Sequence, residues 1–430
     1  MSQELLKSFQ EAYSNLELFP LMQEKEMAQF RVDYGDDLIA DLIQLVEDSP
    51  NGDGKIIFTG HRGCGKSSLL AEFSRQIQEK YFVVLFSIAD TIEMSAVNHV
   101  NILFAIALNL MYEAEARKVA IPKSTKEQIY GWFATRTRTE ERNFQAEAEL
   151  GFDLLSLLKT KLKADATVRD EIKQEFERKI SDLVARINEI AALVKSATQK
   201  EILVIIDDLD KLDLGRVNDI YRDNIKALFQ PNFQIIYTIP IAVLRETFIS
   251  TIITTETNDQ IVVMPVLKIF EKGKNRLPDS HPRIEAQNLL CEILQKRIAS
   301  DLLEKSTAEK LVVQSGGVLR ELIRIANECC RICLRLIRRK PGDKVVIDDS
   351  ILEQAINKIR NDFSIRLGKA DFEILQSTYE NFMPDDPKQP EFLDLLHGLY
   401  VLEYRNDETW YDVHPILVET LRRRGLINNE

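Results

Sequence analysis

The sequence predicts an α/β fold: a parallel sheet with helices on both faces, then a helical region and a smaller mixed C-terminal region. Short apolar segments alternate with stretches of helical spacing up to residue 283, and after that point helical spacing takes over. A strand that is apolar throughout must be covered on both sides. The alternation of such strands with helices therefore indicates a parallel sheet between two helical layers.

Five segments are predicted as buried strands because they are short, apolar and rich in β-branched residues. They are residues 55–59, 81–88, 201–206, 233–238 and 261–266. Helices are predicted before, between and after them, including one near Lys66 and one over residues 98–114. The order of strand, helix and strand predicts the connections that a parallel sheet requires.

Glycines cluster directly after the first predicted strand, where residues 60–67 read Gly-His-Arg-Gly-Cys-Gly-Lys-Ser. Glycines let a loop wrap closely around phosphate groups, and the following helix points its N-terminal N–H groups toward them. The spacing therefore predicts a P-loop for ATP or ADP, in which Lys66 reaches the β- and γ-phosphates and Ser67 ligates Mg²⁺. The predicted nucleotide-binding residues of this loop are Gly60, His61, Arg62, Gly63, Cys64, Gly65, Lys66, Ser67 and Ser68.

An acidic segment follows the third predicted strand, where residues 202–208 read Ile-Leu-Val-Ile-Ile-Asp-Asp. A carboxylate at the end of a neighbouring strand completes such a site by holding Mg²⁺ or its water shell, and Asp207 is predicted to do so. Asp208 is predicted to orient or polarise the attacking water, with Asp210 adding charge. The alternative is a capped strand end in an acidic loop, but both halves of the site occur in the expected order.

Thr238 ends the fourth predicted strand, at the height where a polar group could sense the γ-phosphate or the attacking water. A threonine before Ile239-Pro240 could equally satisfy backbone groups at a strand end. We predict the sensing role from the sheet context, and the second interpretation stays open. The predicted catalytic residues are Lys66, Asp207, Asp208 and Thr238.

A long insertion occupies about residues 115–200, before the third predicted strand. Apolar residues recur three or four positions apart from Val168 to Val194, which predicts one long amphipathic helix. Two roles are compatible with this pattern. The helix packs against the core of its own chain, or it forms an arm for a partner or a neighbouring subunit.

The C-terminal part adds two further patterns. Four predicted helices lie between residues 284 and 359, and from residue 370 the order becomes helix, helix, a β-hairpin around Asn406-Asp407 and a last helix. The last order resembles a winged helix. Together with the P-loop and the Asp-Asp-Leu-Asp segment at residues 207–210, these patterns resemble the AAA+ and STAND class of signalling and DNA-associated ATPases, with an origin-recognition-like core. The resemblance covers most of residues 30–425.

This resemblance implies a P-loop NTPase followed by a helical lid and a winged-helix domain. The length of the chain, 430 residues, also exceeds what one hydrophobic core usually organises, which predicts more than one domain. The predicted regions are an N-terminal helical segment abutting the nucleotide site (1–50), the P-loop NTPase core with its insertion (51–282), the helical lid (283–365) and the winged-helix domain (366–430).

Two residues beyond the core match motifs of that class. Residues 315–322 look like the lid motif in which origin-recognition ATPases place a second sensor arginine, which implies that Arg320 contacts the nucleotide. The STAND version carries proline near Leu319, so this sequence departs from it at the adenine contact. The segment Val413-His414-Pro415 looks like the STAND motif whose imidazole contacts the β-phosphate of ADP, although Pro415 replaces its usual acidic residue. Otherwise Arg320 is an ordinary helix residue and His414 a packed imidazole.

Composition excludes several classes of protein. The net charge of −12 argues against a uniformly basic surface that coats nucleic acid. No apolar run is long enough to span a bilayer and the N-terminus does not read as a secretory signal, so we expect a cytoplasmic protein without a membrane contact. Five cysteines without a regular framework suit a reducing compartment. The cluster at residues 329–333 reads as buried thiols more readily than as a metal site.

These observations predict a regulatory switch that binds ATP and hydrolyses it with slow turnover. It would control its own homo-oligomerisation or a separately encoded effector protein, in bacterial signalling or antiviral defence. The alternative is a DNA-associated AAA+ loader or transposition helper, since basic groups at residues 331–340 and 422–424 invite phosphate contacts. A third hypothesis is a nucleotide-dependent scaffold with negligible turnover. Unranked candidates for an arginine finger are Arg222, Arg245, Arg276 and Arg283.

Overall fold

The structure is a computed structural model that describes residues 2–49, 51–138, 151–277, 279–340, 342–405 and 408–428. The chain divides into two compact units. The first, here called the sheet unit, contains residues 37–59 and 70–263. The second, here called the helical unit, contains residues 1–36, 60–69 and 264–430. The segment predicted as the phosphate loop therefore groups with the helical unit, and the predicted region boundaries stay predictions.

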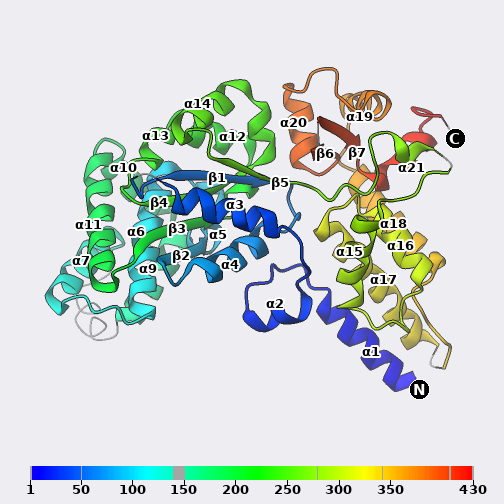
Figure 1. Ribbon diagram of the computed structural model, residues 1–430, viewed down its shortest axis with the longest axis horizontal. Coiled ribbons are helices and arrows are strands. Elements are labelled where there is room, and N and C mark those ends of the chain that lie inside the picture. The colour runs from blue at the N-terminus through cyan, green and yellow to red at the C-terminus, as the bar shows by residue number, and fades with distance from the viewer. Residues whose placement is uncertain are drawn as a thin grey trace. The chain divides into compact units, whose positions relative to one another are not determined.

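Five strands form the sheet, in the order β2, β3, β4, β1, β5 (Figure 1). Their bounds are Lys55–Gly60 for β1, Tyr81–Ser87 for β2, Glu201–Asp207 for β3, Gln234–Pro240 for β4 and Ile261–Met264 for β5. Strand β2 pairs with β3 in parallel, and β3 pairs with β4 in parallel. The predicted α/β fold with a parallel sheet is confirmed, with small shifts at the ends of the strands. The register places Ser87 beside Asp207 at the carboxyl end of the sheet.

Helices of the sheet unit cover this sheet and one another. The longer ones are α3 (Asp36–Glu47), α4 (Lys66–Ile77), α6 (His99–Ala116), α7 (Lys123–Arg136), α9 (Gly151–Ala164), α10 (Ala166–Phe176), α11 (Ile180–Thr198) and α14 (Thr247–Thr257), and the short ones are α5 (Ile88–Thr91), α12 (Leu214–Val217) and α13 (Ile225–Leu228). Helix α6 is buried on nearly every side, because α9, α10 and α11 of the insertion pack against it (Figure 1).

The prediction of one long helix over residues 168–194 is wrong, because the chain breaks between α10 and α11. Lys179, which precedes α11, has φ −132° and ψ 42°, outside the helical range. The break leaves no trace in the apolar spacing, since Phe176 and Ile180 still stand four residues apart. Buried residues of both helices, including Ile172 and Ile187, join the core around α6. The insertion thus packs against its own chain.

The helical unit begins with α1 (Ser2–Asn15) and α2 (Glu24–Phe30). Helix α1 packs against α17 (Figure 1). The later helices are α15 (Ile284–Gln295), α16 (Lys305–Gln314), α17 (Leu319–Arg339), α18 (Asp349–Ser364), α19 (Lys369–Asn381), α20 (Pro390–His397) and α21 (Pro415–Arg423).

Strands β6 (Val401–Arg405) and β7 (Thr409–Val413) form an antiparallel hairpin between α20 and α21. The rings of Tyr404 and Trp410, which face each other across it, stack at 4.5 Å between centroids. The predicted order of helix, helix, hairpin and helix is therefore present, while the predicted tip Asn406-Asp407 lies outside the described residues. Within the described parts of the chain, no helix is long and apolar enough to cross a membrane.

Candidate nucleotide-binding site

The phosphate loop connects the end of β1 to the start of α4, as the sequence predicts. Its glycines have positive φ angles, including 153° at Gly60 and 79° at Gly63. A Cβ added at Gly60 would lie 2.5 Å from the carbonyl oxygen of Met264, and one added at Gly63 would lie 2.4 Å from the Cβ of Arg320. Both backbone conformation and close packing therefore require glycine at these positions.

Lys66 opens α4 and is buried, with 5% of its surface exposed. Its Nζ donates hydrogen bonds to the carbonyl oxygens of Gly60 and His61 at 2.9 and 2.8 Å. The ammonium group is thus held over the loop that is expected to receive phosphates. Ser67 follows in the first turn of α4 and is half-buried.

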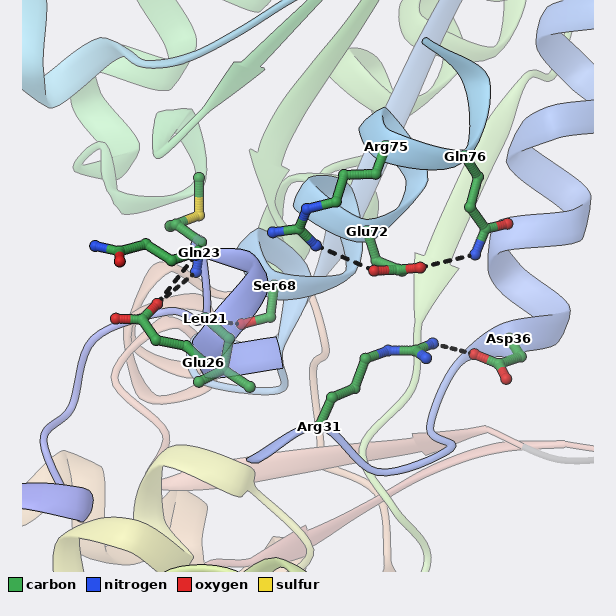
Figure 2. A network of polar contacts seen from close by, with 10 residues as sticks. Leu21, Gln23, Glu26, Arg31, Asp36, Ser68, Glu72, Arg75 and Gln76 are labelled. Atoms are coloured by element: carbon green, nitrogen blue, oxygen red, sulfur yellow. Dashed lines mark hydrogen bonds and ion pairs between the residues drawn. The ribbon is translucent and has the colours of Figure 1, made fainter. Parts of the chain in front are cut away.

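The N-terminal segment contacts the loop through Ser68. Figure 2 shows that the backbone N–H of Leu21 donates to the Oγ of Ser68, at 2.8 Å. Farther along, the hydroxyl of Tyr34 donates to the carbonyl oxygen of Pro265 at 2.7 Å, and its ring lies 3.9 Å from the position of an added Cβ at Gly65. Sequence reasoning missed Leu21 and Tyr34, because a backbone donor and a single tyrosine leave no motif.

The Figure 2 network also shows how the segment before α2 is held. The carboxylate of Glu26 accepts hydrogen bonds from the backbone N–H groups of Met22 and Gln23, both at 3.1 Å, which caps α2. Arg31 forms an ion pair with Asp36 at the start of α3. These bonds fix the chain on either side of α2, and the first set adjoins the residue that binds Ser68.

Three contacts hold the variable positions of the loop against C-terminal elements, and we call them the loop-holding contacts. The Nε2 of His61 accepts a hydrogen bond from the backbone N–H of Glu403 in β6, at 2.7 Å. Arg62 donates from Nη2 to the Nε2 of His397 at the end of α20, at 2.6 Å. The carbonyl oxygen of Gly63 accepts from the N–H of Arg320 in α17, at 2.9 Å. The sequence indicates none of these pairings.

Arg320 lies where the lid motif predicts, in the first turn of α17. Its backbone N–H and its Cβ meet the phosphate loop at Gly63. A contact between its guanidinium group and a nucleotide stays a prediction.

His414 is fully buried and caps the N-terminus of α21, where its Nδ1 accepts from the N–H of Ile416 at 3.3 Å. Its Nε2 is buried and has no hydrogen-bond partner among the described residues. Burial lowers the pKa of His414 to about 3, helped by the nearby charges of Arg324 and His61. The imidazole is therefore neutral, and it lies near a residue of the phosphate loop. The predicted contact with the β-phosphate of ADP requires surrounding groups to move, and it stays a prediction.

The acidic end of β3 lies in the sheet unit. The Oδ1 of Asp207 accepts from the N–H of Asp208 at 2.8 Å, and Asp208 adopts a left-handed backbone with φ 70°. The Oδ2 of Asp208 accepts from the hydroxyl of Ser87 at 2.7 Å, while its Oδ1 pairs with the Nζ of Lys211 at 2.5 Å. Each oxygen of Asp208 thus already accepts one hydrogen bond, so a water that binds there must share the carboxylate with Ser87 and Lys211.

Ser87 and Lys211 are two neighbours of the acidic end that sequence reasoning missed. The signal for Ser87 was available, since the carboxyl ends of adjacent parallel strands meet at one edge of a sheet. The signal for Lys211 was weaker, because a lysine three residues after an aspartate is common in any polar loop.

Three carboxylates gather at this end, where oxygens of Asp207, Asp208 and Asp210 all lie within 4.8 Å of one another. Mg²⁺ prefers oxygen ligands and is usually bound through one or two carboxylates together with substrate phosphates. The donor set therefore fits the predicted role of Asp207 as a metal ligand. Ligation by Ser67 stays a prediction.

Thr238 is fully buried in β4. Its hydroxyl donates to the carbonyl oxygen of Ile206 and accepts from the N–H of Leu209, both at 3.1 Å. These bonds brace the turn that carries Asp207 and Asp208, which agrees with the backbone-satisfying interpretation. The predicted sensing of the γ-phosphate is an additional role that stays a prediction.

Solved structures similar to the chain include three proteins from three organisms. Cdc6p from Pyrobaculum aerophilum matches at 12% identity and a TM-score of 0.42, over 96% of this chain and 98% of that chain. Orc1 from Aeropyrum pernix, solved in complex with DNA, matches at 10% identity and 0.42, over 94% and 97%. The RuvB Holliday junction branch migration motor from Thermotoga maritima matches at 11% identity and 0.39, over 96% and 100%. No curated protein matches the chain.

The sequence matches the AAA ATPase domain family over residues 36–219. This span includes the phosphate loop, Ser87 and the acidic end of β3. Residues 36–219 are therefore similar to an AAA ATPase domain, and the predicted resemblance to AAA+ P-loop ATPases is confirmed. AAA ATPases generally bind ATP or ADP with Mg²⁺.

Proposed function

We propose that this protein is a STAND-like regulatory ATPase that binds ATP with Mg²⁺, hydrolyses it slowly and uses the nucleotide state to control an assembly. Its partner is a second copy of itself or a separately encoded effector, in bacterial signalling or antiviral defence. The observation that carries this proposal is the set of loop-holding contacts. Through them a phosphate loop is bound directly to α17, α20 and β6, which makes the C-terminal elements sensitive to what the loop holds.

The coupling follows from the position of Lys66. Its ammonium group now binds two carbonyl oxygens of the loop, and the β- and γ-phosphates would draw it toward themselves as stronger, charged acceptors. Because the carbonyl oxygen of His61 would lose this partner, the loop would adjust, and His61 also accepts a hydrogen bond from β6. A nucleotide can shift an arrangement of the C-terminal elements only through such differential contacts.

Individual residues receive the following roles in the proposal. Lys66 holds the phosphates and Ser67 and Asp207 bind the metal, while Asp208 orients the attacking water. Bound Mg²⁺ would neutralise the charge that develops on the phosphates during hydrolysis. The pairing of Asp208 with Lys211 supports slow turnover, since an ion pair with a lysine makes the carboxylate a weaker acceptor for a proton of the attacking water.

The described contacts give less support to the DNA-associated alternative. In the basic groups that suggested it, Arg331 pairs with Glu328 at 2.7 Å and Arg423 pairs with Glu419 at 3.0 Å. The guanidinium group of Arg424 lies over the ring of Phe372, 3.9 Å from its centroid. Part of the basic charge is thus engaged within the chain. We also propose a cytoplasmic location, where the five cysteines, none of which forms a disulfide, would stay reduced.

Hydrogen–deuterium exchange tests the proposed coupling. We expect Mg-ATPγS and Mg-ADP to give different exchange rates in residues 397–405, which carry two of the loop-holding contacts, and little difference in α11. Lys66→Ala should remove the difference. Identical exchange at residues 397–405 in both nucleotide states, with nucleotide binding verified separately, would show that the loop does not communicate with β6.

A further inference from the structure

A cavity of about 390 Å³ lies inside the helical unit, among α18, α19, β7 and α21. None of its lining residues belongs to the phosphate loop. Its volume falls in the range of small-molecule sites, roughly 300–1,000 Å³. Aromatic side chains and arginines share its wall, with Tyr379, Trp410, Arg276, Arg360, Arg422 and Arg423 among them.

The carboxylates of this wall neutralise only part of its positive charge. Asp412 is buried and accepts hydrogen bonds from Arg276 at 2.7 Å and from Asn275 at 2.9 Å, so its carboxylate neutralises Arg276, although the Nε of Arg276 is buried without a partner among the described residues. Glu419 serves two arginines, Arg423 at 3.0 Å and Arg422 at 3.9 Å. Four arginines therefore face three carboxylates, the third being the exposed Glu353 at the rim.

Arg360 is the cation left without a carboxylate. It is half-buried, and it donates from Nε to the carbonyl oxygen of Ile416 at 3.0 Å and from Nη1 to the Oδ1 of Asn357 at 2.6 Å. Both acceptors are neutral, and Arg360 forms no ion pair within the described residues. Burial lowers the pKa of Arg360, and the positive charge of Arg423 lowers it further, although Glu419 and Glu353 oppose this. A partly desolvated guanidinium group of this kind favours an anion beside it.

Arg422 has hydrogen-bonding capacity left over as well. Its Nε is buried and has no hydrogen-bond partner among the residues that the structure describes. Its contact with Glu419 is long for an ion pair, at 3.9 Å between Nη1 and Oε2. Two arginines on facing helices, α18 and α21, thus line one cavity with donors to spare.

We propose that this cavity binds a small phosphate ester, with Arg360 and Arg422 as its phosphate-binding residues. Guanidinium groups bind phosphate oxygens through two parallel hydrogen bonds, which is the geometry that a phosphate group matches best. The cavity is larger than a phosphate group, so the ligand carries a further moiety of sugar or nucleoside size. The proposal does not require the chain to hydrolyse ATP.

The cavity wall leads to the phosphate loop within the same unit. Gly316 lines the cavity, and its carbonyl oxygen accepts a hydrogen bond from Tyr404 at 2.8 Å. Four residues later, the N–H of Arg320 donates to Gly63. A ligand at Arg360 would therefore act on the nucleotide site through the turn at Gly316, as an effector of the proposed switch.

Calorimetric titration of the full chain tests the site. The Lys66→Ala variant serves as the parent, because it weakens phosphate binding at the loop, and the probes are inorganic pyrophosphate, ribose 5-phosphate and AMP. We expect at least one probe to bind, and Arg360→Gln or Arg422→Gln to weaken it by about tenfold or more, as the loss of a charged hydrogen bond predicts. Arg338→Gln, which removes an exposed arginine of α17, should leave the affinity within about twofold.

Three results would overturn the proposal. They are no binding of any probe, equal affinities in parent and Arg360→Gln, and Arg360-dependent binding of a short DNA duplex without binding of the small probes. If Arg360→Gln unfolds at a lower temperature than the parent, Arg422→Gln decides the outcome. Because the parent lacks Lys66, failure here leaves the proposed nucleotide switch untouched.

Discussion

The phosphate loop and the acidic end of β3 are organised in opposite ways. The loop draws its partners from residues 320, 397 and 403, more than two hundred positions away in the sequence. The acidic end draws its partners from the next strand along the sheet and from Lys211, three positions on. The loop is therefore tied to the helical unit by long-range contacts, whereas the acidic end is a product of sheet register and of one tight turn.

The test with the largest expected effect removes the positive charge of Lys66 from the phosphate loop. Lys66→Ala should weaken ATP binding by roughly a hundredfold or more, because two charged hydrogen bonds to phosphate are lost. Fluorescence titration with a labelled ATP measures the loss. Asp208→Asn is the matched comparison, since it should keep affinity near that of the parent and slow hydrolysis instead. Normal affinity in Lys66→Ala would remove the loop from the mechanism.

Gly63→Ala tests whether the loop depends on close packing as well as on backbone freedom. We expect it to lower the free energy of unfolding by about 2–4 kcal/mol, from left-handed strain together with the 2.4 Å approach to Arg320. Gly425→Ala is the control, because its φ of 68° is similar and an added Cβ meets nothing within 4 Å. Chemical denaturation measures both variants. Equal losses would mean that strain alone accounts for the effect.

The pH dependence of stability that His414 contributes tests whether water is excluded from this imidazole, which lies near His61. Because the folded-state pKa of about 3 lies below the ordinary value, its contribution to stability is fully present above about pH 6.5 and is lost as the pH falls toward 3. At pH 5 the loss should be about 2 kcal/mol. His414→Asn keeps a capping acceptor and should flatten this part of the pH profile. A profile identical to that of the parent would show that the imidazole is accessible to water.

Lys211→Gln is expected to have the smallest effect and to act on the acidic end alone. Removing the positive charge beside Asp208 should make its carboxylate more basic and raise the rate of ATP hydrolysis by roughly two- to fivefold, an increase within the energy of a single exposed ion pair. ATP affinity should not change. Lys226→Gln removes another exposed lysine that pairs with a glutamate and serves as the control. A slower rate in Lys211→Gln would instead give the lysine a supporting role in hydrolysis.

Features that arise from local sequence patterns could be predicted, whereas features that arise from long-range contacts could not. The strands, the phosphate loop and Asp207 could be predicted, because apolar runs, glycine spacing and strand-end carboxylates are local patterns. The pairing of His61 with Glu403 could not, since it joins a side chain to a distant backbone N–H and depends on how the chain folds back. The break between α10 and α11 was missed for a different reason. Apolar periodicity runs through it unchanged, because both helices pack on the same neighbour.

The burial of α6 has a consequence for how the protein is made. This helix is synthesised well before α9, α10 and α11, whose side chains cover it in the folded chain. At a ribosomal rate of about 5–20 residues per second, its apolar surface waits roughly 4–16 seconds for residue 198 to follow. During that interval the nascent chain presents an unprotected hydrophobic helix. Its production in cells should therefore respond strongly to the supply of chaperones that bind nascent chains.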